Sequence, residues 1–206
     1  MVVHGARRAG VAKMKSAATI WVLASLIGRC VHGAEVVPWE RVGRIAQLLC
    51  MTAAHESGLV HRRQIGFDVD SEKGAFSLWQ VEKASICDSL KWLGTHALVR
   101  MNLMKGLEVA STESASALGG AGYWSAEGEG RGMPRLLRLL QEPEGDVLGC
   151  ALARLHYIRF PSPIPEGLEA MARMAKEQYN TGEGKATAEK YLSAYRRLFG
   201  WMDRRD

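Results

Sequence analysis

One run of apolar residues, recurring at steps of three and four between Val42 and Glu56, constrains the fold more than any other feature of the chain. Val42, Ile45, Leu49 and Ala53 repeat with the period of one helical face, and Glu56 falls on that same face. The pattern therefore predicts a helix whose core side ends in a carboxylate.

We expect this helix to begin near Pro38 and to end at about Ser57. Proline fits the first turn of a helix, where its missing N–H is not needed, and the acidic Glu40 is favoured by the positive end of the helix dipole. Glu56 then lies in the last turn.

Two interpretations of Glu56 are open from this pattern. Burial removes water from a carboxyl group, raises its pKa and keeps it protonated near neutral pH, which is the property of a general acid. The alternative is an ordinary, partly solvated glutamate that caps the following turn. The rarity of buried charge favours this alternative when periodicity is considered alone.

Three sequence blocks in order carry a resemblance to a known family. The first is Glu56-Ser57-Gly58, the second covers residues 71–81 (SEKGAFSLWQV) and the third covers residues 177–184 (EQYNTGEG). Together they resemble the lysozyme-like lytic transglycosylases, whose pattern is a Glu-Ser pair, a Gly-Ala-x-Gly-Leu-Met-Gln run and a Tyr-Asn-x-Gly-x-Gly segment. The resemblance extends over residues 39–195 and is strongest in the three blocks.

The chain departs from that family pattern in three ways. Ser77 stands where the family usually has glycine, Trp79 stands where it has methionine, and extra residues lengthen the segment 61–70. The longer segment and the tail at residues 184–191 (GKATAEKY) look most like phage-encoded or mobile-element members. Tyr191 and a second tyrosine four residues later follow the third block at helical spacing.

The resemblance implies a mostly α, lysozyme-like domain with a small β-hairpin beside the catalytic helix. It also implies a lytic transglycosylase that cleaves the MurNAc-GlcNAc bond of peptidoglycan, with Glu56 as general acid and then base, and without a cofactor. Tyr179 would hydrogen-bond the Glu56 carboxyl or the N-acetyl group of the substrate, and Gln80 would offer one acceptor and two donor hydrogens to a sugar. The residues implied at the substrate are Ser57, Ser77, Trp79, Gln80, Tyr179 and Asn180.

The type of reaction depends on a second carboxylate. Any cleavage of a glycosidic bond needs one protonated carboxyl group, and hydrolysis needs a second carboxylate as nucleophile or base. Asp68 or Asp70 would supply it in the alternative, a hydrolysing muramidase, whereas a transglycosylase uses the substrate's own groups. An alternative of another class is a catalytically silent protein that binds the cell wall or serves as a structural part of a virion.

Composition supports one domain and an anionic partner. The chain has 206 residues, 47% of them hydrophobic, which is enough for one catalytic domain, predicted at residues 38–206. Its net charge of +5 suits an anionic polymer. The basic residues are scattered and do not alternate with stacking aromatics, which disfavours nucleic acid. The resemblance implies peptidoglycan glycan strands as the partner. The protein is predicted to be a monomer if free, or else to contact virion or envelope-complex proteins.

The four cysteines form no Cys-x-x-Cys pair, and no histidine set accompanies them at zinc spacing, so no metal site is predicted. Cys50 lies beside the apolar face of the Glu56 helix and is predicted to be a small buried hydrophobe.

Residues 1–37 allow two interpretations. Basic residues, an apolar run from Ala17 to Ile27 and small residues near Gly33 have the layout of a secretory signal or membrane anchor, although the run is short for a transmembrane helix. The alternative is an amphipathic helix of the domain. With the resemblance, the first interpretation predicts a periplasmic, cell-envelope or virion-associated location.

The remaining segments read as follows. Residues 65–70 alternate between apolar and polar, the period of a short strand. Tyr123 and Trp124 lie on a glycine-rich loop and either stack on sugars or close a core edge. One or two helices are predicted at 86–107, with Leu90, Leu93, Ala97, Met101 and Met104 facing inward, and further helices at 134–140, 146–160, 166–178 and 187–198.

Overall fold

The computed structural model describes residues 17–29, 38–64, 66, 73–119, 132–160, 162–180 and 186–201. Within these ranges the chain is mostly α-helical and carries one small two-stranded antiparallel sheet, which confirms the predicted mostly α class with a small β-hairpin. The strand predicted at 65–70, with Asp68 and Asp70, lies outside the described residues except for Gly66. So do the loop with Tyr123 and Trp124, the basic residues of the N-terminus and Cys30.

The helices agree with the predicted segments to within a few residues, except for the helix at 112–119, which the sequence analysis did not predict. Residues 17–29 are helical, and the elements that follow are α2 (Trp39–Ser57), β1 (Ala75–Phe76), β2 (Val81–Glu82), α3 (Lys83–Thr95), α4 (Ala97–Ala110), α5 (Thr112–Gly119), α6 (Met133–Leu139), the 3-10 turn η1 (Pro143–Gly145), α7 (Asp146–Ile158), α8 (Leu168–Gln178) and α9 (Ala188–Phe199).

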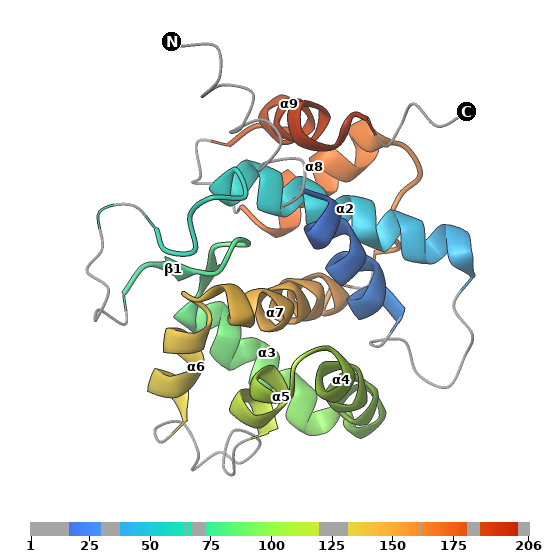
Figure 1. Cartoon of the computed structure of the whole chain (residues 1–206). Helices are drawn as coiled ribbons and strands as arrows, with labels where there is room; N and C mark the ends of the chain where they lie inside the picture. Colours follow the sequence, from blue (N-terminus) through green and yellow to red (C-terminus); the bar gives the residue numbers. More distant parts are fainter. Residues whose placement is uncertain are drawn as a thin grey trace.

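Helix α7 occupies the centre of the molecule (Figure 1). It contacts α2 on one side, and α3, α4 and α5 on the other. Helices α8 and α9 complete the first side by packing on α2 and on each other. Nearly every side chain of α7 is buried as a result, so this helix connects two groups of helices through one core.

Helix α2 has the predicted extent and the predicted buried face. Pro38 precedes its first turn, and Gly58 ends it in the left-handed conformation, with φ of 59°, which glycine adopts without steric cost. Ile45, Leu49 and Ala53 are fully buried on the face that continues to Glu56. The helix therefore runs along the core and places Glu56 at its C-terminal end, on the face that the periodicity predicted.

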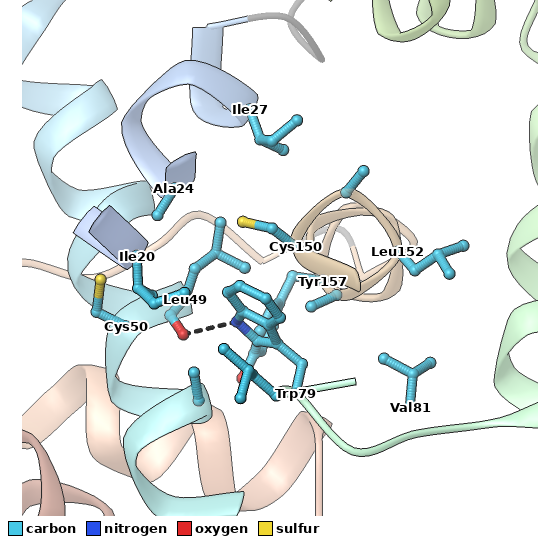
Figure 2. Packing of buried hydrophobic residues seen from close by; sticks show 14 of the residues in the cluster. Ile20, Ala24, Ile27, Leu49, Cys50, Trp79, Val81, Cys150, Leu152 and Tyr157 are labelled. Atoms are coloured by element: carbon cyan, nitrogen blue, oxygen red, sulfur yellow. Dashed lines mark hydrogen bonds between the residues drawn. The ribbon is translucent and has the colours of Figure 1, made fainter. Parts of the chain in front are cut away.

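The helical residues 17–29 belong to the same core. Ala17, Ile20, Ala24 and Ile27 are buried at spacings of three and four and belong to one cluster with α2 and α7. Figure 2 shows Ile20 beside Leu49 of α2, and Ile27 on the side of Cys150 of α7. This packing is what the amphipathic-helix interpretation of the segment predicts. Within the described helices, none combines the length and the apolar character needed to cross a bilayer.

The hairpin packs against α2 and α7. Phe76 pairs with Val81, and the tight turn between them buries Trp79, whose indole N–H donates to the carbonyl of Leu49 at 2.9 Å (Figure 2). The sequence analysis predicted a small hairpin beside the Glu56 helix but recognised a strand period only at 65–70, not at these residues. Two-residue strands are too short for any period to be visible.

A close approach fixes the turn of the hairpin against α7. Ser77 has a positive φ of 66°, a backbone conformation that is unfavourable for a residue with a side chain. Its hydroxyl accepts a hydrogen bond from the N–H of Trp79 at 3.2 Å. A Cβ atom on Gly149 of α7 would lie 2.6 Å from the Cβ of Ser77. Only glycine at position 149 lets the turn come this close to the helix.

Contacts on both sides of the undescribed residues 67–72 hold the hairpin in place. Arg62 binds Asp146, at the start of α7, through two hydrogen bonds of 2.8 and 2.7 Å. The N–H of Gln64 donates to the carbonyl of Ala75 at 3.0 Å. The chain that follows α2 is thus tied both to α7 and to the first strand.

Some predicted core positions are wrong. Ala97 and Met101 are exposed, and Met104 is half-buried, whereas Leu90 and Leu93 are buried as predicted. The helix is interrupted at His96, between α3 and α4. The helical period therefore starts again with a new phase, which places Leu103 and Leu107 in the core. Cys50 is buried, as predicted, and its thiol is free.

We predict that Ile27→Ala lowers the free energy of unfolding by about 2–5 kcal/mol, because it leaves a cavity where a fully buried side chain packed. Val22 lies on the same helical segment and is 64% exposed, so Val22→Ala serves as the control and should change stability little. Urea unfolding of the two variants measures the difference. Equal effects would contradict the packing of residues 17–29 in the core.

We predict that Gly149→Ala destabilises the fold by about 1–3 kcal/mol through overpacking against the turn. The added methyl group meets the Cβ and Oγ atoms of Ser77, so Ser77→Gly in the same chain should restore part of the loss. A double-mutant cycle in denaturant measures the coupling between the two sites. Strictly additive effects would show that the two residues do not constrain each other.

Candidate active site

A cleft of about 520 Å³ opens where α2, the hairpin, α3, α7 and α8 converge. Glu56 enters it from the last turn of α2, and the hairpin contributes Gln80. The structure therefore brings four of the predicted site residues, Glu56, Gln80, Tyr179 and Asn180, to one cavity. Its lining residues are Glu56, Gln64, Ala75, Gln80, Val81, Glu82, Ser85, Asp88, His156, Arg159, Tyr179 and Asn180.

The Glu56 carboxyl is half-buried and hydrogen-bonded. The hydroxyl of Tyr191, on α9, donates to its Oε1 atom at 2.5 Å. Burial is the main influence on Glu56 and raises its pKa above the ordinary value; hydrogen bonds from Tyr191 and Asn180 oppose this rise, and the charge of Glu82 adds to it. The net direction favours the protonated form, which a general acid requires.

Tyr191 is held as a proton donor. Burial, and next the negative charge of Glu56, raise the pKa of the Tyr191 hydroxyl, so that it stays protonated. Its ring packs on that of His55, with centroids 3.9 Å apart. The sequence marked Tyr191 by its spacing after the third block but assigned it no role at the site.

Gln80 faces the cleft with its amide partly engaged. It has a positive φ of 50°, and its side-chain NH₂ donates to the carbonyls of Ser77 at 2.8 Å and His61 at 3.1 Å. The two donor hydrogens that the sequence analysis offered to a sugar are therefore used within the protein. The amide oxygen remains as the atom that can accept a hydrogen bond from a ligand.

The hydroxyl of Tyr179 is directed elsewhere than predicted. It donates to the carbonyl of Trp79 at 2.8 Å, while Tyr191 takes the position on Glu56. The ring of Tyr179 stacks on that of Tyr157, with centroids 5.4 Å apart. Tyr179 thus joins the end of α8 to the hairpin, and the proton of its hydroxyl is used within the protein.

Ser57, Ser77 and Trp79 are buried and do not line the cleft. The Ser57 hydroxyl donates to the carbonyl of Ala53 at 3.0 Å and accepts from the N–H of Leu59 at 3.2 Å, so it closes the end of α2. Ser77 and Trp79 hold the turn of the hairpin. The matched blocks therefore combine cleft residues with residues that position them.

His156 and Ser85 form a pair in the cleft that the sequence did not indicate. The Nε2 atom of His156 lies 2.7 Å from the carbonyl oxygen of Gln178, and Nδ1 lies 2.8 Å from the hydroxyl of Ser85. A carbonyl only accepts, so Nε2 carries the proton and Nδ1 accepts from Ser85 in neutral histidine. Burial is the main cause that lowers the pKa of His156 and favours this neutral form. The two residues lie 71 positions apart, which no local pattern reveals.

Other charged groups share the cleft with Glu56. Glu82, at the end of β2, is exposed, and Asp88 lies 3.8 Å from the guanidinium of Arg159. Sequence reasoning assigned no role to these three residues. The predicted second carboxylates, Asp68 and Asp70, lie outside the described residues, so Glu82 and Asp88 are the further carboxylates that the described part of the chain places here.

The cleft can supply one proton, from Glu56, and several hydrogen bonds to a ligand. Across the residues that the structure describes, no three or more His, Cys, Asp or Glu side chains gather as a metal site would need.

A search of protein-family models, curated proteins and solved structures returns no match to the chain.

We predict that Tyr191→Phe raises the pKa of Glu56 further. The tyrosine hydroxyl stabilises the carboxylate form, so its removal leaves the effect of burial less opposed. A hydrogen bond to a charged group is worth enough to move the pKa by about one unit. A carbon-13 NMR titration of the Glu56 carboxyl measures the shift. Tyr179→Phe, which removes a hydroxyl bonded to a carbonyl, is the control, and an unchanged or lowered Glu56 pKa in Tyr191→Phe would refute the prediction.

Proposed function

We propose that the protein is a lytic transglycosylase of lysozyme-like fold that cleaves the glycan strands of peptidoglycan. The observation that carries the proposal is Glu56, whose pKa is raised by burial and whose carboxyl opens into a polar cleft at the end of a helix. A mostly helical fold with a hairpin packed beside this helix supports it. The three blocks of family resemblance are the reason for naming peptidoglycan as the substrate.

The proposed reaction uses one carboxyl group twice. Glu56 first gives its proton to the glycosidic oxygen as the bond from that oxygen to the MurNAc C1 carbon breaks. The N-acetyl group of the substrate stabilises the positive charge that grows on C1. The 6-hydroxyl oxygen of the same sugar then bonds to C1 and returns its proton to Glu56, which yields a 1,6-anhydro sugar and the original acid.

The neighbours of Glu56 suit these two roles. Tyr191 and Asn180 donate to the carboxyl and stabilise it after it has lost its proton, while burial favours its protonation before the reaction. Because these influences oppose each other, the Glu56 carboxyl can both give up its proton and take one back during the reaction. The amide oxygen of Gln80 accepts a hydrogen bond from a sugar hydroxyl or N-acetyl N–H.

The second candidate is a hydrolysing muramidase on the same site. It is favoured by one observation, the presence of Glu82 in the cleft with a charge that acts on Glu56. Two carboxyl groups separated by about 5–9 Å serve hydrolysis, as acid with nucleophile or as acid with base. In this mechanism Glu82 joins Asp68 and Asp70 as a candidate second carboxylate.

The setting of the protein follows from the proposed substrate. Access to glycan strands places the enzyme at the cell envelope or on a virion, and its positive net charge suits the anionic wall. A catalytically silent wall-binding or virion protein with this fold would keep the cleft but would not depend on Glu56.

Mass analysis of fragments released from purified peptidoglycan tests the proposal. We expect the wild-type chain to release muropeptides one water lighter than ordinary reducing muropeptides, and Glu56→Gln to release none, because its amide has no acidic proton to give. Glu108→Gln, at an exposed carboxylate of α4, is the matched control and should behave like wild type.

The other results are equally decisive. Ordinary reducing ends that depend on Glu56 would replace transglycosylation by hydrolysis and direct attention to Glu82, Asp68 and Asp70. Fragments from Glu56→Gln would remove Glu56 from the mechanism. Absence of fragments from wild type, with retained binding to peptidoglycan, would favour the silent protein.

A further inference from the structure

A second cavity, also of about 520 Å³, lies between the first half of α2, the end of α7, the segment after α7, and α8. It uses none of the residues that line the Glu56 cleft. Tyr157 lines this cavity, Tyr179 lines the cleft, and their rings stack, so the ring pair lies between the two cavities. The lining residues are Arg41, Arg44, Arg154, Tyr157, Ile158, Phe160, Ser162, Pro163, Ile164 and Met174.

Three arginines from two helices give this cavity its charge. Arg154 of α7 is only 5% exposed, which is unusual for a residue that carries a charge at neutral pH. Burial, and next the positive charge of Arg41, lower the pKa of Arg154 to about 10, so it remains protonated at neutral pH. The like charge of Arg41 makes the site more favourable for an anion.

The third arginine is paired at the rim. Arg44 donates to the carboxylate of Glu166 at 2.6 Å, and this exposed partner offsets part of the positive charge of Arg44. Among the described residues that line the cavity, three are arginines and none is a carboxylate. The cavity is therefore a positive pocket, and guanidinium groups bind carboxylates and phosphates through paired hydrogen bonds.

The rest of the wall is apolar. Ile158, Phe160, Ile164 and Met174 line the cavity together with the ring of Tyr157. The hydroxyl of Tyr157 is bonded to that of Thr52 at 2.7 Å, within the core. A ligand that touches this wall gains by burying an apolar group, while its charged end meets the arginines.

We propose that this arginine pocket binds an organic anion, with its oxyanion group held by Arg41 and Arg154 and its apolar part against Phe160 and Ile164. Buried positive charge and apolar surface in one concave site fit this class of ligand better than they fit a neutral sugar or an inorganic ion. The proposal does not depend on the activity of the Glu56 cleft.

Calorimetric titration of the full chain with hexanoate tests the proposal. We expect saturable binding of hexanoate, weaker binding of inorganic phosphate, and none of hexanamide, which has the same apolar chain without the charge. Arg41→Gln should weaken hexanoate binding about ten-fold, the effect of losing a charged hydrogen bond. Arg41 is exposed, so this variant keeps the fold, whereas Arg154 is part of the core.

Arg173→Gln is the control of matched charge, because Arg173 is an exposed residue of α8 that does not line the pocket. It should bind hexanoate like wild type. No saturable hexanoate binding, equal losses in the two variants, or equal affinity for hexanamide would overturn the proposal. Phosphate binding as tight as hexanoate binding would refute the organic class of ligand, because the apolar wall would then contribute nothing.

Discussion

The burial of a carboxyl group at the end of an apolar helix face is the constraint around which the cleft is built. The face of α2 that places Ile45 and Leu49 in the core also takes Glu56 out of bulk water, and the lost hydration raises its pKa. A buried polar group without partners destabilises a fold, so the surroundings must provide donors. Helix α9 provides the Tyr191 hydroxyl, and the end of α8 leads to Asn180. The packing of α2, α8 and α9, which forms one side of the core, therefore also determines the environment of the carboxyl group.

The opposite wall of the cleft depends on a second steric condition. Gly149 allows the turn of the hairpin to touch α7, and Trp79 fixes the same turn to α2 through the carbonyl of Leu49. Gln80 follows directly in the chain, and its amide is held by the carbonyl of Ser77. The position of Gln80 in the cleft thus results from core packing on its neighbours. The positive φ of Ser77 is a conformation that glycine would adopt at lower cost than serine.

Local sequence was informative wherever one helical period remained unbroken. The bounds of α2, the buried face of α2 and the predicted N-terminal residue of α9 follow from apolar spacing, capping residues and a following glycine. The same reasoning failed across His96, where a break resets the helical phase and leaves Ala97 and Met101 exposed. It also failed for the hydroxyl of Tyr179, because the sequence placed this residue near Glu56 but could not distinguish the carboxyl from the nearby carbonyl of Trp79 as its acceptor.

The sequence by itself determined the helical class of the fold, the helix that carries Glu56 and a short list of residues for one site, because periodicity and turn chemistry are properties of neighbouring residues. Only the tertiary structure decided that Glu56 pairs with Tyr191, 135 residues later, that Ser85 meets His156, and that Arg41 and Arg154 share one pocket. It also separated Ser57, Ser77 and Trp79, which support the site from the core, from the residues that line it. These pairings depend on how helices cross and how closely they pack, and neither can be deduced from the separation of two residues in the sequence.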